Sequence, residues 1–332
     1  MASVRRVVLA YNSIYVVDDG GGRVLVDTGP DYRGSFDIAY EAIGHPLPGL
    51  VVATHGHLDH AGLGARWRDA GVPVAIGAND ANLVRDPAQR DARAFETMAA
   101  FVRASGAPGE VVAEVIKGLE QRRDWSRRAS MERDYRPGGP GQRWPTGLRF
   151  EPFEPTTVFE ADSTDVGCGL AALQTPGHTP GNLVLVHEAE GWLFSGDQLL
   201  PEITPTPAIQ PLPPGQGEGT WRFHSLPHFV ASLNRLAALH LTRCFPGHGE
   251  PFDDVAAAIA TNLAAIEQRT DRVLSELHEL HDATLYDIAE RLYPRAVRRR
   301  FWQIISTVQG HLDLLEAEGA VVPRDHGYEH VP

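Results

Sequence analysis

Histidine and aspartate side chains are concentrated in one short segment, residues 55–60, which reads His-Gly-His-Leu-Asp-His. It follows directly on an apolar run that we predict to be a β-strand. Residues i and i+2 of an extended loop project to the same side, so His55 and His57 can bind one metal ion. Asp59 and His60 open the helix-like sequence that follows and can reach a second ion. Four ligand-type side chains at this spacing predict a metal-binding segment.

Three later segments each place one further ligand-type residue in a tight turn, rich in glycine and proline, at the end of a predicted strand. These residues are His178 in Thr-Pro-Gly-His-Thr-Pro-Gly, Asp197 in Phe-Ser-Gly-Asp, and His248 in Phe-Pro-Gly-His-Gly. Glycine beside a ligand lets the backbone approach a metal ion without a clash from Cβ. Each segment alone could be only a turn, but in this order behind residues 55–60 they predict one metal centre.

The overall composition is that of an ordinary globular protein, with 332 residues, 42% apolar and 22% charged. A net charge of −13 argues against bulk attraction to nucleic acid or an anionic membrane. The two cysteines, Cys168 and Cys244, exclude a disulfide framework and a thiolate zinc cluster, and we expect buried free thiols. We find neither a targeting signal nor about 18 consecutive apolar residues, so we expect a cytoplasmic protein without a membrane segment.

Strands with tight connections, alternating with helices, must position the ligand-type residues, and together they indicate a mixed sheet packed by helices. Before and between the metal segments we predict strands at Val4–Leu9, Ile14–Val17, Arg23–Asp27, Leu50–Thr54, Val72–Ile76, Thr157–Phe159, Leu170–Thr175, Leu183–His187 and Trp192–Ser195. Residues 79–155 interrupt this pattern with helical spacing and a Pro/Gly-rich return, so we interpret them as a helical insertion. A helix over about 226–239 leads to the last metal segment.

The chain after the last metal segment is predicted to be a separate C-terminal unit. A long helix is expected from Asp253, a second from a Thr284 N-cap through Leu292, and a third over 301–319. A small hairpin over 320–331 completes a compact unit of winged-helix type. We therefore predict two domains, residues 1–255 with the insertion and residues 256–332.

In the order and residue types of its four metal segments, the sequence resembles the metallo-β-lactamase superfamily of metallohydrolases, over roughly residues 5–77 and 155–255. The resemblance implies an αββα sandwich with its site at one edge, between two sheets. It also implies two metal sites, the first formed by His55, His57 and His178 and the second by Asp59, His60 and His248, with Asp197 bridging both. Asp27, in Val-Asp-Thr-Gly, matches a family turn that supports the ligands from behind.

Imidazole and carboxylate ligands suit Zn²⁺, with Fe²⁺ and Mn²⁺ as alternatives. Two such ions about 3.5–4 Å apart can share a hydroxide and polarise a carbonyl or phosphoryl oxygen. Asp59 lies where it could hold the proton of that hydroxide and pass it to a leaving group. We therefore expect a hydrolase that requires two divalent metal ions, in which Asp59 and Asp197 are catalytic.

Two substrate classes remain open. One is an acyl derivative (thioester, ester or lactone), and the other is a phosphodiester or nucleic acid. Residues 54–64, 175–187 and 194–210 contain no Lys or Arg, which favours a small acyl substrate over a polyanion. A β-lactamase-like activity is a further alternative, although true zinc β-lactamases usually lack the equivalent of His60 or of Asp197. The C-terminal extension and the residues after Asp197 resemble a "β-lactamase-like" subgroup of bacterial hydrolases and a mitochondrial endoribonuclease.

The C-terminal unit carries a basic cluster, but residues 284–332 contain six Arg against seven Asp and Glu. Binding of nucleic acid through Arg295, Arg298, Arg299 and Arg300 is therefore not favoured. A DNA-binding winged helix with the hydrolase part as a sensor is the non-enzymatic alternative, and a homodimer is plausible. Several aromatic and histidine side chains could either line the substrate site or lie in the core: Trp125, Tyr135, Trp144, Phe153, Trp221, Phe223, His224 and His228.

Overall fold

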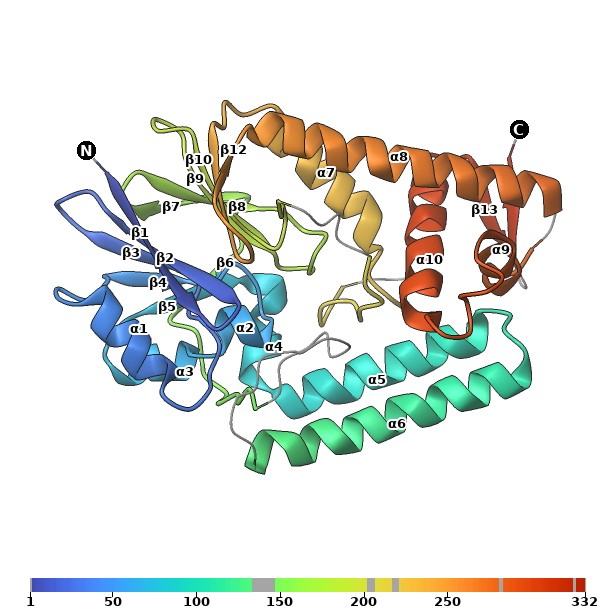
Figure 1. Ribbon diagram of the computed structural model, residues 1–332, viewed down its shortest axis with the longest axis horizontal. Helices are drawn as coiled ribbons and strands as arrows, with labels where there is room; N and C mark the ends of the chain where they lie inside the picture. The colour runs from blue at the N-terminus through green and yellow to red at the C-terminus, as the bar shows by residue number, and fades with distance from the viewer. Residues whose placement is uncertain are drawn as a thin grey trace.

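Two six-stranded sheets face each other at one end of the molecule, and helices cover their outer faces and extend away from them (Figure 1). The computed structural model describes residues 2–132, 147–201, 207–216, 221–280, 283–324 and 327–331, with the backbone alone for 122–132. Tyr135 and Trp144 lie outside the described residues, as does the side chain of Trp125.

The first sheet contains the N-terminal strands in sequence order. They are β1 (Ser3–Leu9), β2 (Asn12–Asp18), β3 (Arg23–Val26), β4 (Leu50–Val52), β5 (Val74–Gly77) and β6 (Thr157–Phe159). The strands β1 to β3 pair antiparallel, and β3 to β6 pair parallel. The parallel crossovers are made by α1 (Ser35–Ile43) and by α2 (Leu58–Ala61) with α3 (Gly64–Asp69).

The second sheet contains the strands of the later metal segments. In spatial order they are β12 (Phe252–Asp253), β11 (Arg243–Pro246), β10 (Trp192–Gly196), β9 (Leu183–His187), β8 (Leu170–Gln174) and β7 (Ser163–Gly167). Only β10 and β11 pair parallel, and α7 (Ser225–Ala237) lies between them in sequence. Strand β12 precedes the long helix, which therefore begins at Val255 and not at Asp253 as predicted.

Successive residues of the inner strands pack on opposite faces of the sheet and so belong to different hydrophobic layers. In β2, Ile14 packs toward α1 and α3, while Tyr15 packs between the two sheets. In β9, Leu185 faces the first sheet and Val186 faces α7 and α8. A sheet covered on both faces needs strands that are apolar throughout, which is why these runs are continuously hydrophobic. The result is a layered helix–sheet–sheet–helix sandwich.

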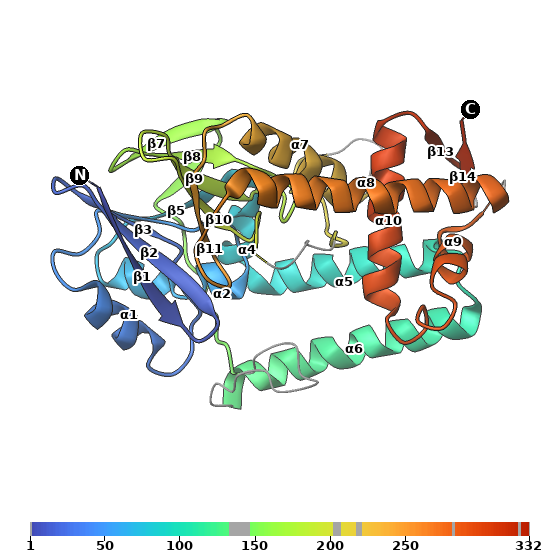
Figure 2. The same cartoon turned by 45° about the horizontal axis from the view of Figure 1, so that its top comes forward.

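The helices between β5 and β6 and the helices at the C-terminus share one hydrophobic core. After η1 (Ala78–Asp80), the first set contains α4 (Ala81–Arg85), α5 (Pro87–Ala104) and α6 (Gly109–Glu132). The second set contains α8 (Val255–Leu280), α9 (Leu285–Leu292), α10 (Phe301–Ala317) and the hairpin β13 (Val321–Arg324) with β14 (Gly327–His330). Figures 1 and 2 show α9 and α10 lying between α8 and the α5–α6 pair, where Phe101 and Val102 pack with Ile288 and Ile305.

Two further expectations concern the cysteines and the membrane. Cys168 and Cys244 are buried free thiols, as predicted. Within the described residues, none of the helices has both the length and the apolar character needed to cross a membrane.

Candidate metal centre

The ligand-type residues all follow strands that end at the same edge of the sandwich. His55 and His57 follow β4, and Asp59 and His60 lie in α2, the next element along the chain. His178 lies in the turn between β8 and β9, Asp197 follows β10, and His248 follows β11. The two sheets are joined at this edge by a hydrogen bond from the Leu183 amide to the Thr54 carbonyl oxygen (2.7 Å).

The structure brings the seven predicted residues together in two adjoining groups. We call His55, His57, His178 and Asp197 the first ligand group, and Asp59, His60 and His248 the second; in each group the candidate ligand atoms lie within 4.8 Å of one another. Asp197 connects the two groups. Its Oδ2 lies 3.5 Å from His178 Nε2, and its Oδ1 lies 3.3 Å from both His60 Nε2 and His248 Nε2.

Three imidazoles are oriented by a hydrogen bond at the nitrogen that faces away from the cluster. His60 Nδ1 bonds Asp27 Oδ2 (2.8 Å), His55 Nδ1 bonds Thr54 Oγ1 (3.0 Å), and His248 Nδ1 donates to the Tyr11 carbonyl oxygen (3.1 Å). The ring of Tyr11 also stacks on that of His248. Such bonds select the tautomer and turn Nε2 of each ring toward the cluster, where it can bind a metal ion.

Burial and charge set the protonation of the first ligand group. Burial lowers the pKa of His178 to about 3 and keeps the pKa of His55 well below its ordinary value, so both rings are neutral at pH 7. Burial opposes the charge on Asp197, but the neighbouring His60 holds the pKa of its carboxyl well below the usual range. Neutral imidazoles beside an ionised carboxylate are the states that bind a divalent cation.

The imidazoles of the second ligand group lie beside ionised carboxylates. Burial opposes the charge on His248, yet the carboxylates of Asp197 and Asp59, 3.3 Å and 3.2 Å from its Nε2, raise its pKa to about 10. His60 Nε2 and Asp197 Oδ1 are buried and, within the part of the chain that the structure describes, have no hydrogen-bond partner. Unpartnered buried polar atoms are costly, and a metal ion bound between them would satisfy both. The residues present therefore fit the two-ion site that the sequence predicts.

Gly247 lets the backbone lie close to the ligand-type side chains. A Cβ on Gly247 would lie 2.5 Å from His60 Cε1 and 3.1 Å from Asp197 Oδ1. Any larger residue before His248 would therefore displace the ligands themselves.

Asp80 is a site residue that the sequence analysis did not single out. Its side chain is buried and ties together the two loops of the first ligand group. Oδ2 accepts hydrogen bonds from the Gly56 amide (2.8 Å) and the Thr179 hydroxyl (2.7 Å), and Oδ1 accepts from the Gly181 amide (2.7 Å). Only the fold brings Asp80 between the segments of Gly56 and Thr179, which are 123 residues apart, so no local motif could have indicated this role.

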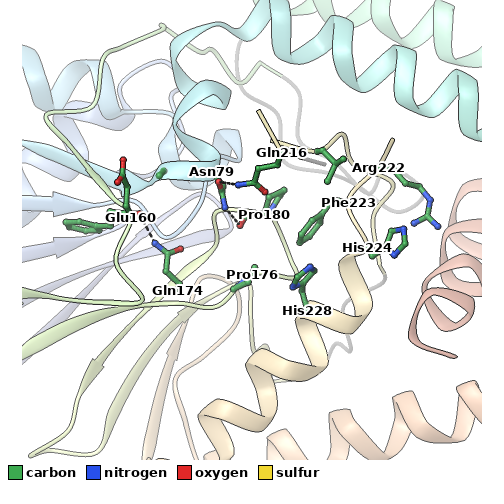
Figure 3. A pocket seen from close by; sticks show the side chains of 13 residues that line it. Asn79, Glu160, Gln174, Pro176, Pro180, Gln216, Arg222, Phe223, His224 and His228 are labelled. Carbon is green, nitrogen blue, oxygen red and sulfur yellow. Dashed lines mark hydrogen bonds between the residues drawn. The ribbon is translucent and has the colours of Figure 1, made fainter. Parts of the chain in front are cut away.

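The aromatic and histidine residues expected near the substrate site divide between core and cavity. Phe153 packs in the core beneath the first sheet, where it touches Gly64, and is not a wall of the site. Phe223, His224 and His228 line a cavity of about 660 Å³ beside the His178 turn, as Figure 3 shows, whereas Trp221 is largely exposed.

A third group of potential ligands, His224, Asp313 and Glu316, lies at the contact between α7 and α10. Both carboxylate oxygens of Asp313 already accept hydrogen bonds from the buried guanidinium of Arg222. That cation occupies the carboxylate and repels another, so the third group does not fit a metal ion.

Comparison with known proteins assigns the family. Residues 8–248 match the sequence model of the metallo-beta-lactamase superfamily, which is most of the chain. The chain therefore belongs to the metallo-β-lactamase superfamily.

Individual relatives and solved structures cover different shares of the chain. A probable metallo-hydrolase of Bacillus subtilis, YqjP, is 27% identical over 93% of this chain and 88% of its own. An atrochrysone carboxyl ACP thioesterase of Pseudocercospora fijiensis is 27% identical over 40% of this chain and 36% of its own. A crystal structure of a metallo-beta-lactamase family protein from Thermus thermophilus superposes with a TM-score of 0.66 at 22% identity, covering 99% of this chain and 98% of that one. That last likeness shows the fold.

The family and the two ligand groups together define the class of protein. The chain is a metal-dependent hydrolase of this superfamily, built as a sandwich of two mixed sheets with helices.

Proposed function

We propose that the chain hydrolyses an acyl carbonyl compound, a thioester, ester or lactone, with two divalent metal ions held by the seven residues. The first ion would be held by His55, His57 and His178 and the second by Asp59, His60 and His248, with Asp197 between them. The observation that carries the proposal is the meeting of both groups at Asp197, whose two oxygens face different groups. Zn²⁺ is the expected metal, and Fe²⁺ and Mn²⁺ suit the same ligands.

Metal ions bound there would activate a water molecule and polarise the substrate carbonyl. The chain's own residues would hold and move the proton. Asp59 is ionised because the nearby His60 outweighs the effect of burial and lowers the pKa of its carboxyl. Its Oδ2 lies 3.2 Å from His248 Nε2, at the centre of the cluster. From this position Asp59 can accept the proton of the attacking water and deliver it to the leaving group.

Charge around the site favours an acyl substrate over a polyanion. The strand-end loops that carry the ligands contain no Lys or Arg. The structure adds two arginines near His57, Arg90 and Arg93, which the sequence analysis did not place there. Arg90 is paired with Asp91 (2.9 Å), and Arg93 donates to the Leu212 carbonyl oxygen (2.6 Å), so both guanidinium groups already have acceptors. The thioesterase likeness supports the same substrate class.

We also propose that the C-terminal unit is of winged-helix type and supports the active site, without binding nucleic acid. Its α10 contacts the loop beside the metal centre: a Cβ on Gly310 would lie 2.5 Å from Pro207. Asp313 of α10 forms a buried ion pair with Arg222, three residues before the start of α7. Its basic cluster is exposed, and Arg298 lies 3.5 Å from Glu110 of α6.

A substrate panel tests the proposed class of reaction. The purified protein, reconstituted with Zn²⁺, is assayed against thioesters, esters, lactones, β-lactams and bis-p-nitrophenyl phosphate under the same conditions. We expect the highest kcat/KM on one of the acyl compounds. A clear preference for the phosphodiester would support the nuclease alternative and contradict this proposal.

A further inference from the structure

Two cavities meet beside the turn that carries His178. The smaller, of about 360 Å³, begins at His57 and runs between α5 and the loop 209–214; we call it the entry cavity. The larger, of about 660 Å³, lies beyond it and is drawn in Figure 3; we call it the far cavity. Three residues, Asn79, Pro180 and Leu212, line both cavities and therefore form the partition between them.

The entry cavity starts at the metal centre and is bounded largely by hydrocarbon. His57 is an exposed member of the first ligand group, and it lines the cavity together with neighbouring Leu58. The opposite walls are Leu83, Ala94, Ile209 and the proline-rich run 211–214. The arginines and Asp80 on its wall are bonded within the protein, so an uncharged apolar group suits this space better than an anion.

The loop that forms one wall is held on three sides. Gln210 Nε2 donates to the His178 carbonyl oxygen (2.8 Å), which fixes the loop to the metal centre. Arg93 donates to the Leu212 carbonyl oxygen from α5, and Gly310 of α10 packs against Pro207. A wall held in this way gives the cavity a defined shape before a substrate binds.

The partition is also bonded across its width. Asn79 Oδ1 accepts a hydrogen bond from Gln216 Nε2 (2.7 Å), and Asn79 Nδ2 donates to the Pro180 carbonyl oxygen (3.4 Å); both bonds are drawn in Figure 3. Leu212 adds the apolar part of the partition. A chain that enters from His57 therefore reaches these residues before it reaches the far cavity.

We propose that the entry cavity binds the apolar acyl chain of the substrate, with its carbonyl at the metal centre, and that the partition sets the longest chain accepted. This inference rests on the proposed acyl hydrolysis and adds the part of the substrate that determines specificity. Each methylene buried before the partition adds to binding, whereas a chain that reaches Leu212 and Asn79 must displace them.

The test is the dependence of kcat/KM on acyl length, from acetyl to hexadecanoyl thioesters, with the Zn²⁺-loaded protein. For the wild type, kcat/KM rises by up to about fourfold per methylene and then falls beyond a limiting length. Ala94→Phe places a ring in the entry cavity and shortens that limit, lowering the octanoyl-to-acetyl ratio by about tenfold or more. Leu212→Ala opens the partition and increases the longest acyl chain that is accepted.

Leu263→Ala is the matched control, because it removes the same atoms from a half-buried leucine of α8 that lines neither cavity. It should keep the wild-type chain-length profile. If thioesters are hydrolysed but the limiting length is the same in all four proteins, the inference is overturned and the proposed function stands.

Measurements of fatty-acid binding distinguish a failure of this inference from a failure of the proposed function. Calorimetry of the same four proteins with fatty acids from butanoate to dodecanoate needs no turnover. If no acyl compound is hydrolysed, the proposed function fails, but chain-length-dependent binding that Ala94→Phe weakens still supports an apolar-chain cavity. Fatty-acid binding that is independent of length and unchanged by Ala94→Phe contradicts it.

Discussion

At the scale of single residues, each ligand group is supported by a carboxylate that is not itself a proposed ligand. Asp27 supports the second ligand group because it bonds the His60 ring, and it also accepts a hydrogen bond from the Thr54 amide (2.7 Å). Asp80 holds the loops of His57 and His178 and serves the first. Asp27 could be predicted from the sequence because it lies in a recognisable turn; Asp80 could not, because its partners are distant in sequence.

We expect substitutions of the two supporting carboxylates, Asp27 and Asp80, to weaken different metal sites. Asp80→Asn should weaken the first site by about 10- to 100-fold, because an amide cannot accept all three hydrogen bonds. Asp27→Asn should weaken the second site to a similar degree. Competition with a chelator during Zn²⁺ titration measures both affinities, and Asp31→Asn, at another buried carboxylate, is the control. Equal weakening of both sites by both variants would contradict this division.

Asp59 and Asp197 should be needed for activity but not for folding. The two sheets pack through an apolar core that includes neither carboxylate, so the fold should persist without either of them. We expect Asp59→Ala and Asp197→Ala each to lower kcat/KM by at least about 100-fold on the best substrate, with little loss of thermal stability. Near wild-type turnover by either variant would show that the proposed mechanism is wrong.

At the scale of elements, the sequence predicted the strands next to the metal centre well. Strand β9, buried at every position, has the predicted bounds, as does the short edge strand β6, and the turns after β8, β10 and β11 carry the later ligand-type residues. Strand β7 was missed because it is a polar edge strand, Ser163–Gly167, that depends on pairing with β8. Helix α1 was missed although Phe36, Ala39 and Ile43 have helical spacing, because glycines bound it closely on both sides.

The contact between α8 and α10 is expected to make the stability of the fold sensitive to acid. Burial, aided by Arg269, lowers the pKa of His311 to about 4, and His311 Nδ1 bonds Thr270 Oγ1 (2.8 Å). Above the ordinary histidine pKa of 6.5 the ring is neutral in both the folded and the unfolded state. As the pH falls from 6.5 toward 4, the unfolded chain takes up a proton that the folded chain resists, so the free energy of unfolding decreases.

Thermal unfolding at pH 7 and pH 5 measures this effect. We expect the Tm of the wild type to fall more between these pH values than that of His311→Gln. His240→Gln, at an exposed histidine, is the control for the loss of a histidine. An identical pH dependence of Tm for wild type and His311→Gln would exclude this role for His311.

At the scale of the whole molecule, the insertion and the C-terminal unit are one structural body. From sequence alone they are predicted to be separate, because their helical patterns lie about 120 residues apart. In the structure, α5 and α6 complete the core of α8, α9 and α10, and this body holds the loop beside the metal centre. The boundary at residue 255, the homodimer and the cytoplasmic location stay predictions.

This arrangement predicts opposite outcomes for two changes in the C-terminal unit. Removal of residues 284–332 should expose Phe101, Val102 and Val111 and lower both stability and hydrolysis. Replacement of Arg298, Arg299 and Arg300 by Ala should leave hydrolysis of a small acyl substrate nearly unchanged, because these side chains are exposed and line neither cavity beside the metal centre. Salt-sensitive duplex binding that the triple substitution abolishes would instead support the nuclease alternative.

The central claim is that two divalent metal ions bind through the seven residues, and metal analysis of the reconstituted protein tests it most directly. We predict two equivalents of Zn²⁺ per chain for the wild type. His178→Ala and His248→Ala should each lower this to about one equivalent, because each removes a ligand from a different group. Fewer than one equivalent in the wild type, or two equivalents retained in both variants, would contradict the account.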